Sequence, residues 1–501
     1  MSLLGIDVGT SGCKVAVFSE DGCMLASAYE EYDYRRPQPG WAELDTLQVW
    51  DIVKRTIRKA VAGATNDPIK ALTVSSLGEA VVPATTDRQI LGPSLLNFDV
   101  RGAAYLAELH SVVDDERLYQ INGNTLGNHY SLTKLKWIKQ HQPDRYQQTD
   151  KFLHWSGFVS YMLGADAAVD YSLANRTLLF DLDRCDWSDE LLERVGLDRS
   201  KLPRTVPSGS VIGSVARNIA YELDLPAGIP IVSGGHDQCC NGVGCGVIEP
   251  GQAMYGMGTY ITMMPVFRHR REPGAMIERG LNTEHHAAPG RYVSFIYNLG
   301  GALVKWFRDT FAMAERQQAK ATGQDIYSML TAEMPDKPSS VMALPHWGPT
   351  GPPKFIADSC GVMAGLRLET SRGEILKGIL EATAFYLREC FESLPATGIT
   401  IDDFRAVGGG SKSDAWIQIC ADILGRPFVR AKINEAGALG AAIIAGTGSG
   451  IFPSLEVGVE TMVKLDRTFY PDPQQQRLYD DRFEKYRRLW PLMADYLREL
   501  T

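Results

Sequence analysis

The segment from Gly5 to Phe18 constrains the fold most, because it predicts two apolar strands joined by a tight glycine turn. One apolar run reaches Asp7, the turn Gly9-Thr10-Ser11-Gly12 follows, and a second strand contains Lys14. Small residues in such a turn let backbone amides and hydroxyls close around a phosphate, with lysine as the counter-charge. Asp7 would hold Mg²⁺ or its water, because hard cations prefer oxygen ligands. Taken alone, the segment is equally compatible with an ordinary glycine-rich hairpin.

The same pattern recurs later in the chain. Residues 251–262 again predict strand, Gly258-Thr259 turn and strand, and Asp237 lies shortly before them. A third cluster, Gly408 to Asp414, follows a predicted strand and precedes a predicted helix over 415–424. There a helix N-terminus and small residues permit close approach of a flat ligand such as adenosine. The order of these clusters predicts a duplicated fold whose halves face each other across nucleotide phosphates.

Length and composition limit the class of protein. A chain of 501 residues is too long for one core, so we predict two α/β domains, over residues 1–245 and 246–501. Strands alternating with helices in the first half support this layout. The net charge of −9 argues against a nucleic-acid surface, which needs a basic stripe, and against an anionic membrane surface.

Targeting and cysteine patterns point to a cytoplasmic protein. The chain enters its first predicted strand almost at once, and we find no apolar stretch of the roughly 20 residues that a membrane span needs. The nine cysteines include no CxxC pair. We interpret the cluster Cys239, Cys240 and Cys245 as small buried hydrophobes rather than metal ligands.

With these features together, the chain resembles the FGGY carbohydrate kinases of the actin/hexokinase/Hsp70 superfamily. Residues 131–138 look like the first family signature and residues 361–381 like the second, with departures at His129 and Gly378. The resemblance covers nearly the full length. It implies two ribonuclease-H-like domains that flank a deep catalytic cleft, with the sugar on the first domain, ATP on the second, and ATP and Mg²⁺ as cofactors.

Asp237 is the candidate catalytic residue. A neutral alcohol is a poor nucleophile, so a carboxylate must accept its proton, and phosphoryl transfer otherwise needs mainly positioning and charge stabilisation. Asp237 follows a predicted buried strand and matches the catalytic aspartate of the family. We assign Asp7 and Asp237 to the metal. The alternative is an aspartate that only caps a turn.

The expected nucleotide site draws on both halves. Phosphate binding is assigned to the residues of the two turns and the lysine after the first: Thr10, Ser11, Lys14, Gly258 and Thr259. The resemblance adds residues near the nucleotide and the adenosine: Gly301, Lys305, Gly410, Ser411 and Asp414. Lys305 is equally compatible with an ordinary solvated lysine.

The expected acceptor site consists of charged and amide groups, which suit polyhydroxy ligands because each hydroxyl both donates and accepts. Its members are Glu79, Asn97, Asp99, Arg101, His129 and Gln238. His129 is also compatible with an ordinary locally bonded histidine. Glu79 corresponds to a family position that grips substrate hydroxyls.

The acceptor itself is the open question. Glycerol kinases carry an arginine immediately before the residue that corresponds to Glu79, and xylulose kinases carry a Met-His pair in that loop, whereas this chain has Gly78. We therefore expect a roomier pocket and favour ATP-dependent phosphorylation of a pentulose such as xylulose. The alternatives are a glycerol- or erythritol-type polyol kinase and, from a different class, an Hsp70/actin-like ATPase or a non-catalytic sugar-binding relative. We expect a small sugar or polyol and ATP as partners, with no nucleic acid and no membrane, and leave a homodimer open.

Overall fold

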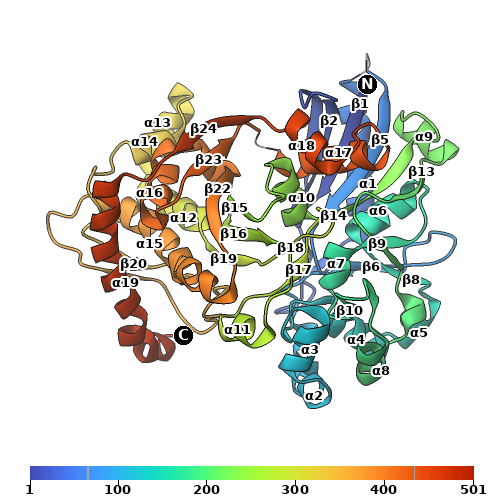
Figure 1. The fold of residues 1–501 in the computed structure, drawn as a ribbon, viewed down its shortest axis with the longest axis horizontal. Coiled ribbons are helices and arrows are strands. Elements are labelled where there is room, and N and C mark those ends of the chain that lie inside the picture. The colour runs from blue at the N-terminus through green and yellow to red at the C-terminus, as the bar shows by residue number, and fades with distance from the viewer. Residues whose placement is uncertain (65–66, 434) are drawn as a thin grey trace.

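The computed structural model describes residues 1–64, 67–433 and 435–501. Its centre consists of two large sheets, one in each half of the chain (Figure 1). The first has the strand order β13-β14-β5-β1-β2-β3. Its strands are β1 (Ser2–Val8), β2 (Gly12–Ser19), β3 (Met24–Glu31), β5 (Ile69–Ser76), β13 (Val211–Ser214) and β14 (Pro230–His236).

Register within the first sheet brings the expected site residues to one edge. Strands β1 and β14 both run parallel to β5, and β2 returns antiparallel to β1. Asp7 lies opposite Lys14 on β2 and Ser75 on β5, while His236 lies opposite Ser76. The carboxyl ends of three parallel strands therefore meet there, which is the edge where α/β sheets bind ligands.

The second sheet repeats this plan. Its order is β17-β18-β16-β15-β22-β23-β24, with β19 beside β16. A hairpin of β15 and β16 is again followed by parallel strands, β22 and β23. The strands are β15 (Gly251–Met257), β16 (Tyr260–Phe267), β17 (Glu284–His285), β18 (Tyr292–Val293), β19 (Ile296–Leu299), β22 (Ile401–Val407), β23 (Phe428–Ala431) and β24 (Leu465–Phe469). The predicted duplication of the α/β unit is confirmed.

Helices α10 (Asp237–Gly244) and α17 (Ala436–Gly448) lie between the two sheets (Figure 1). They cross in backbone contact: a Cβ on Gly244 would lie 1.9 Å from the carbonyl oxygen of Ala436, and one on Gly440 1.9 Å from that of Cys240. A Cβ on Gly5 of β1 would similarly meet the carbonyl oxygen of Ala438. The small residues at the start of α17 therefore permit this close packing, and this helix from the second half covers the first sheet.

The core is correspondingly shared between the halves. Leu3 and Val232 of the first sheet lie in one apolar cluster with Leu439 of α17 and Met254 of β15. Cys239, Cys240 and Cys245 belong to the same buried cluster, as expected. The boundary near residue 245 stays a prediction.

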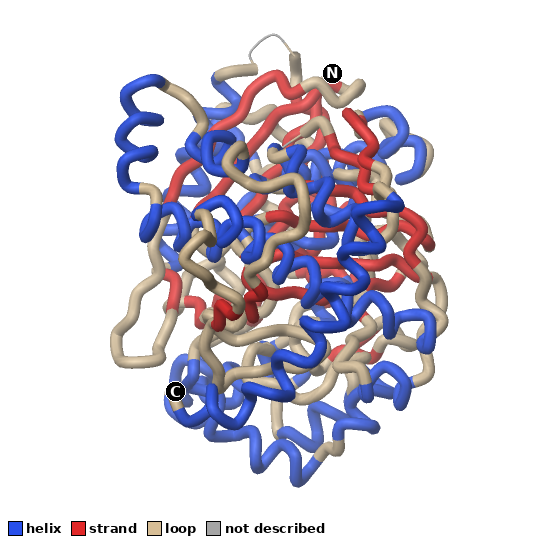
Figure 2. Tube along the Cα trace, turned by 90° about the vertical axis from the view of Figure 1, so that its left-hand side faces the viewer, coloured by secondary structure: helices blue, strands red, loops and turns tan. Residues whose placement is uncertain are grey.

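The remaining elements surround these layers, and the strands are enclosed by helices in Figure 2. In the first half they are β4 (Glu43–Leu44), α1 (Thr46–Ala62), β6 (Val81–Ala84), β7 (Ser94–Leu95), α2 (Leu106–Val112), α3 (Asp115–Asn122), α4 (Ser131–His141), α5 (Pro143–Gln148), β8 (Lys151–His154), α6 (Trp155–Leu163), β9 (Ala168–Asp170), α7 (Tyr171–Asn175), β10 (Phe180–Asp181), β11 (Asp186–Trp187), α8 (Asp189–Val195), β12 (Arg204–Val206) and α9 (Arg217–Leu223). In the second half they are α11 (Pro273–Glu278), α12 (Gly301–Phe311), α13 (Met313–Thr322), α14 (Ile326–Thr331), β20 (Met342–Leu344), β21 (Val362–Ala364), α15 (Arg372–Ser393), α16 (Asp414–Leu424), α18 (Leu455–Met462) and α19 (Pro473–Glu499).

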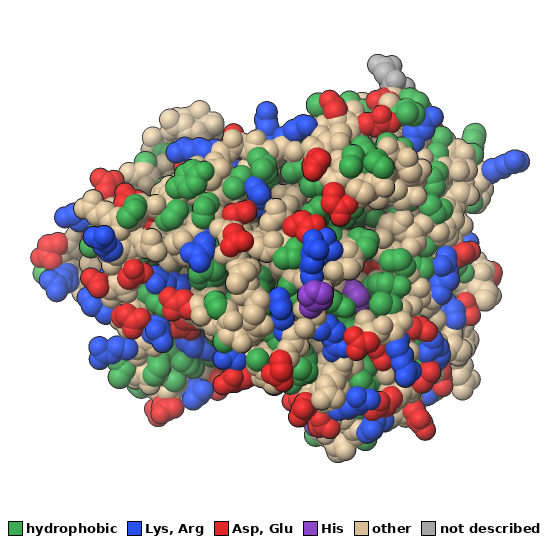
Figure 3. Space-filling model, viewed as in Figure 1, with side chains coloured by type: hydrophobic (Ala, Val, Ile, Leu, Met, Phe, Trp, Pro, Cys, Tyr) green, Lys and Arg blue, Asp and Glu red, His purple; other side chains and the backbone are tan. Residues whose placement is uncertain are grey.

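The surface mixes both signs of charge. On the face drawn in Figure 3, acidic and basic side chains alternate without a large region of one sign. Among the described helices, none combines the length and the apolar character that a membrane crossing requires.

Candidate functional site

Asp7 lies at the end of β1 and faces helix α17. Its Oδ1 accepts a hydrogen bond from Ser75 Oγ at 2.9 Å. A Cβ on Gly437 would lie 2.8 Å from its Oδ2, so the first turn of α17 approaches the carboxylate. Burial raises the pKa of Asp7 to about 6, although the Ser75 hydrogen bond and Lys14 oppose the rise. The Asp7 carboxylate therefore offers oxygen atoms as metal ligands at a site that is partly shielded from water.

The first glycine turn lies beside Asp7. The amide of Gly9 donates to the carbonyl of Gly12 at 2.9 Å, and the Ser11 side chain is exposed at the tip, next to the half-buried Thr10. Lys14 forms an ion pair with Glu435, just before α17. A phosphate that takes Lys14 as its counter-charge would have to share this lysine with Glu435.

Asp237 is the first residue of α10 and directly follows β14. The ring of His236 caps the helix, because its Nδ1 accepts from the Gln238 amide at 3.2 Å. That same Nδ1 lies 3.3 Å from Asp237 Oδ1, and the Asp237 side chain is 26% exposed. Burial raises the pKa of Asp237 to about 7, and the negative charge of Asp7 adds to the rise. The two expected metal carboxylates therefore lie close enough to repel each other.

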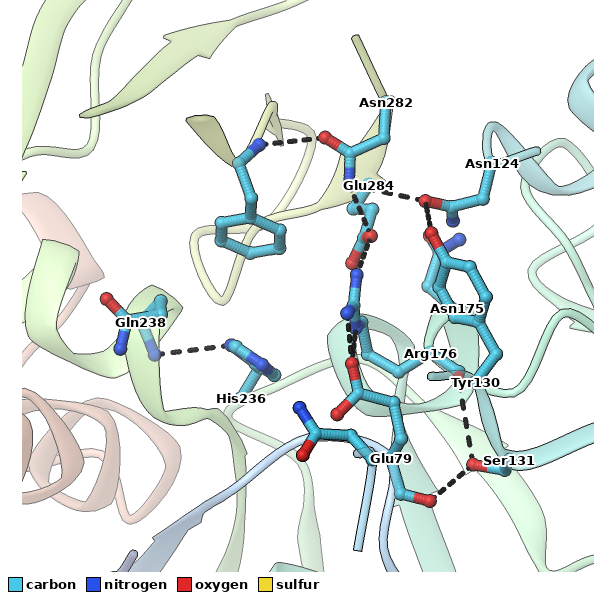
Figure 4. Close-up of polar contacts among 12 residues, drawn as sticks. Glu79, Asn124, Tyr130, Ser131, Asn175, Arg176, His236, Gln238, Asn282 and Glu284 are labelled. Atoms are coloured by element: carbon cyan, nitrogen blue, oxygen red, sulfur yellow. Dashed lines mark hydrogen bonds and ion pairs between the residues drawn. The ribbon is translucent and has the colours of Figure 1, made fainter. Parts of the chain in front are cut away.

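A buried triad of charged residues lies next to Gln238 and His236, as Figure 4 shows. Arg176, which follows α7, donates from Nε to Glu79 Oε1 at 2.8 Å and also pairs with Glu79 through NH2. Its NH1 donates to Glu284 Oε1 at 2.5 Å. Arg176 and Glu284 are absent from the sequence prediction, and Glu284 comes from the second half of the chain. We refer to these residues as the Glu79–Arg176–Glu284 triad.

The charges of the triad are strongly perturbed. Burial alone would raise the pKa of Glu79, but the Arg176 guanidinium, together with His129 and His236, outweighs burial and lowers that pKa to about 2. Burial also raises the pKa of Glu284, where Arg176 only partly compensates. The neighbouring histidines are neutral near pH 7, because burial lowers the pKa of His129 to about 4 and that of His236 to about 3.

The space beside Gly78 is already filled. A Cβ at this position would lie 2.9 Å from His236 Nε2 and 3.7 Å from Arg176 Nε. The expectation that Gly78 enlarges the pocket is therefore wrong. Gly78 instead admits the imidazole of His236 and a guanidinium that arrives from another part of the chain.

Asp99 and Arg101 satisfy each other. The Asp99 carboxylate accepts from the Ala42 amide at 2.6 Å and from the Arg101 guanidinium at 2.7 Å. Arg101 also pairs with Glu43 at 2.9 Å and lies over the Trp41 ring, 4.1 Å from its centroid. Asn97 accepts from the amide of Phe98 at 3.0 Å. Of the expected acceptor residues, Glu79 belongs to the triad, His129 lies within the electrostatic reach of Arg176 and Glu79, and Gln238 is hydrogen-bonded to His236. Asn97, Asp99 and Arg101 lie in a neighbouring cluster, where Arg101 pairs with Asp99.

The second-half loops converge at one edge of the second sheet. The carbonyl of Gly258 accepts from the Gly301 amide at 2.8 Å, and that of Thr259 accepts from Ala302 at 3.1 Å, so the β15–β16 turn caps α12. Lys305 lies on the exposed side of the same helix.

The Gly408 loop emerges beside this turn. Val407 lies opposite Gly256 on the parallel strand, and a Cβ on Gly408 would lie 3.1 Å from the Met257 carbonyl. Within the loop, Ser411 Oγ donates to the carbonyl of Gly408 at 2.7 Å, and Gly410 packs against the ring of Trp416. Asp414 is exposed and pairs with Arg430 at 2.6 Å and Arg467 at 2.8 Å. The expected nucleotide residues of the second half therefore lie around one sheet edge.

Comparison with known proteins agrees with this geometry. Residues 2–244 match the N-terminal domain, and residues 256–449 the C-terminal domain, of the FGGY family of carbohydrate kinases. The chain is 30% identical to an autoinducer-2 kinase of Escherichia coli strain K12 over 502 residues, which cover 97% of this chain and 94% of that protein.

Solved structures share the fold over nearly the whole chain. A "xyloylose kinase" from Brucella ovis is 25% identical with a TM-score of 0.87, covering 99% of this chain and 100% of that one. A glycerol kinase of Plasmodium falciparum with ADP is 20% identical with a TM-score of 0.84, covering 99% and 98%. The predicted actin/hexokinase-like two-domain fold is confirmed. This chain belongs to the FGGY family of carbohydrate kinases.

Proposed function

We propose that this carbohydrate kinase transfers the γ-phosphoryl group of ATP to a hydroxyl of a pentulose such as xylulose, with Asp237 as the general base. The observation that carries the proposal is Asp237 itself. Its carboxylate lies at the end of β14, beside Asp7 and within the electrostatic reach of Glu79. A carboxyl whose pKa is about 7 suits proton abstraction near neutral pH, because catalysis is most efficient when the pKa of the base is close to the working pH.

The chemical step needs few groups. The acceptor oxygen forms a bond to phosphorus, the bond from phosphorus to the ADP oxygen breaks, and the hydroxyl proton passes to Asp237. Because the transition state is loose, positioning and charge stabilisation account for most of the catalysis. The neutral His236 ring accepts a hydrogen bond from the Gln238 amide through Nδ1, which lies 3.3 Å from Asp237 Oδ1, so it packs beside the carboxylate without donating to it.

ATP would contact both sheet edges. Thr10, Ser11 and Lys14 offer hydroxyls and a cation from the first turn, and Gly258 and Thr259 offer the second turn. The second-half edge would hold the adenosine side, with Gly301 and Lys305 on α12 and Gly410, Ser411 and Asp414 in the following loop. Support comes from the convergence of these loops and from the family membership.

The residues present fit a magnesium ion. Mg²⁺ is usually held by one or two carboxylates, several waters and substrate phosphates rather than by a complete protein cage. Asp7 and Asp237 supply two carboxylates whose mutual repulsion a cation would relieve. Among the described residues, groups of three or more His, Cys, Asp or Glu side chains suited to a metal are absent. When bound, the ion would neutralise charge on the transferring phosphoryl group.

The acceptor would lie against Glu79, His129 and Gln238, with Asn97, Asp99 and Arg101 in the adjoining cluster. A second candidate acceptor is autoinducer-2, because kinases of that name match this chain over 97% of its length. A polyol of the glycerol or erythritol type is a further alternative. A homodimer stays a prediction.

An acceptor panel tests the proposal. Release of ADP from ATP and Mg²⁺ is measured with xylulose, ribulose, xylitol, erythritol, glycerol and autoinducer-2, and without acceptor. We expect a pentulose to raise ATP consumption well above the basal rate, because a hinge near residues 243–250 would let the two halves close on the bound acceptor and keep water from taking the phosphoryl group. Equal rates with and without every acceptor would instead favour the Hsp70/actin-like ATPase. Autoinducer-2 as the best acceptor would overturn the pentulose assignment but not the kinase.

A further inference from the structure

The Glu79–Arg176–Glu284 triad contains two carboxylates and one guanidinium. Glu79 and Arg176 come from the first half, separated by 97 residues, whereas Glu284 belongs to β17 of the second sheet. The side chains of Glu79, Arg176 and Glu284 are 6%, 11% and 1% exposed. An ion pair this far from solvent is weakly screened, so its net charge acts on any nearby ligand.

The guanidinium has little left to offer a ligand. Its Nε and NH2 point to Glu79, and its NH1 points to Glu284. The rings of Tyr130 and Phe295 lie near it, with centroids 4.9 Å and 5.7 Å from the guanidinium carbon. Arg176 is therefore committed to the two carboxylates and is a poor partner for an acidic ligand.

Glu284 holds its position firmly. Its Oε1 accepts from Arg176 and from Asn282 Nδ2 at 2.6 Å, and Asn282 is fixed in turn because its Oδ1 accepts from the Phe295 amide at 2.8 Å. Glu284 Oε2 is buried without a hydrogen-bond partner among the described residues. The triad thus carries one more carboxylate than its single cation can balance.

Other nearby cations are held in place by neighbouring groups in the described part of the chain. The Lys134 ammonium group donates to the carbonyls of Asn97 and Asn128, which position it without cancelling its charge, and it interacts electrostatically with Asp99 and Glu79. Arg101 is paired with Asp99 and Glu43. The Nδ1 of His236 accepts from the Gln238 amide at 3.2 Å and therefore carries no proton, and burial keeps the pKa of His129 low, at about 4.

We infer that the acceptor site selects uncharged polyhydroxy compounds and excludes sugar acids, and that Glu284 is the positioning residue that sets this selectivity through Arg176. The inference rests on the proposed acceptor site. Carboxylates accept hydrogen bonds from hydroxyl groups, so neutral polyols and ketoses are matched. The four carboxylates Glu43, Asp99, Glu79 and Glu284 are balanced by only three cations, Arg101, Lys134 and Arg176. An acidic acceptor would therefore add a like charge to this excess, and juxtaposed like charges cost several kcal/mol.

The substitution Glu284→Gln removes the negative charge of this side chain while nearly keeping its shape. The glutamine keeps an oxygen for Arg176 NH1 and a similar volume, but it leaves Arg176 balanced by Glu79 alone. An acidic acceptor should then be tolerated better. Glu284→Asp keeps the negative charge, so this variant should exclude acidic acceptors as the wild-type protein does.

The test uses matched pairs of acceptors that differ only in an alcohol or a carboxylate at one end: erythritol and erythronate, xylitol and xylonate, glucitol and gluconate. The ratio of kcat/KM for alcohol over acid is measured from ADP release at fixed ATP. In the wild-type protein we expect this ratio to exceed about 100 for the best pair, the scale of a like-charge penalty. In Glu284→Gln we expect it to fall by about tenfold or more, mainly through KM for the acid, with KM for ATP unchanged.

Glu381→Gln is the matched control. Glu381 of α15 is also a buried carboxyl of the second half, hydrogen-bonded to the amide of Ser339 at 3.0 Å and to Tyr479 OH at 3.1 Å. The same chemical change there should leave the alcohol-to-acid ratio unaltered. A ratio that falls equally in both variants would show a general loosening and would overturn the role of Glu284.

Two results overturn the inference while leaving the proposed function intact: acids turned over as well as alcohols by the wild-type protein, or an unchanged ratio in Glu284→Gln. Failure of every acceptor to stimulate ADP release would instead refute the proposed function. Thermal stabilisation of the wild-type protein by each alcohol and acid gives a second readout that needs neither turnover nor a variant. Equal stabilisation by both members of each pair would also count against the inference.

Discussion

Replacing Asp237 with asparagine should change activity and stability in opposite directions. The amide keeps the size of the side chain but cannot take the acceptor proton. Loss of a positioned general base typically lowers turnover by about 10²- to 10⁴-fold, so we expect kcat to fall at least about a hundredfold while ATP still binds.

The stability effect follows from the pKa. The carboxyl pKa is raised from 3.8 to about 7, so protonated Asp237 is stabilised relative to ionised Asp237 in the folded protein. The contribution of Asp237 to the free energy of unfolding is fully present below pH 3.8, where the carboxyl is protonated, and is lost as the pH rises through about 7. At pH 8 the ionised carboxylate therefore costs up to about 4 kcal/mol by linkage. Because the side chain is a quarter exposed, we expect Asp237→Asn to gain roughly 1–3 kcal/mol at pH 8 and little at pH 4.

Two measurements check this reasoning. Chemical denaturation at pH 4 and pH 8 gives the free energy of unfolding, and ADP release with the best acceptor gives kcat. Glu381→Gln removes another buried carboxyl whose pKa is raised to about 7, so it should share the stability gain at high pH and keep normal turnover. An Asp237→Asn protein with near-normal turnover would refute the base. One with a lower free energy of unfolding at pH 8 would show that Asp237 mainly stabilises the first turn of α10.

The other predictions concern the acceptor and the crossing of helices α10 and α17. Glu79→Ala should abolish activity with the best acceptor and leave ATP affinity intact, as measured by nucleotide titration; an equal loss of ATP affinity would contradict the assignment. A five-carbon ketose or polyol should exceed glycerol in kcat/KM by about tenfold, because missing hydroxyls leave buried polar groups unpaired at about 1–3 kcal/mol each; glycerol as the best acceptor would refute this. Gly440→Ala should lower the free energy of unfolding by several kcal/mol or prevent folding, because its Cβ would lie 1.9 Å from the Cys240 carbonyl. Gly409→Ala should be nearly neutral in the same denaturation experiment, because its Cβ would meet nothing within 4 Å. Equal stability of the two variants would contradict the close crossing of α10 and α17.

The parts of the site that the sequence could predict are those that depend on residues close together in the chain. The turns at Thr10 and Thr259 each connect two strands in sequence, so the phosphate-binding hairpins are recognisable without any tertiary information. Asp237 is recognisable because a buried strand leads directly into it. The small residues of α17 likewise predict close packing, although not that the helix would cover the sheet of the other half.

The triad could not be predicted because tertiary packing alone assembles it. Arg176 follows α7 and meets Glu284 of β17 across 108 residues, and nothing in the local spacing of either residue specifies that pairing. One signal was available: Arg176 interrupts a run that is otherwise short of charge, Leu173 to Leu182 apart from Asp181, and a lone cation in a buried run needs an anionic partner. Asp99 and Arg101 lie two residues apart in the sequence, and in the structure the Arg101 guanidinium donates to the Asp99 carboxylate, whereas their role in acceptor binding stays a prediction. Opposite charges that are neighbours in the chain tend to pair with each other. Residues that must remain available to a ligand are therefore better sought where buried carboxylates and buried cations differ in number, as they do at Glu284.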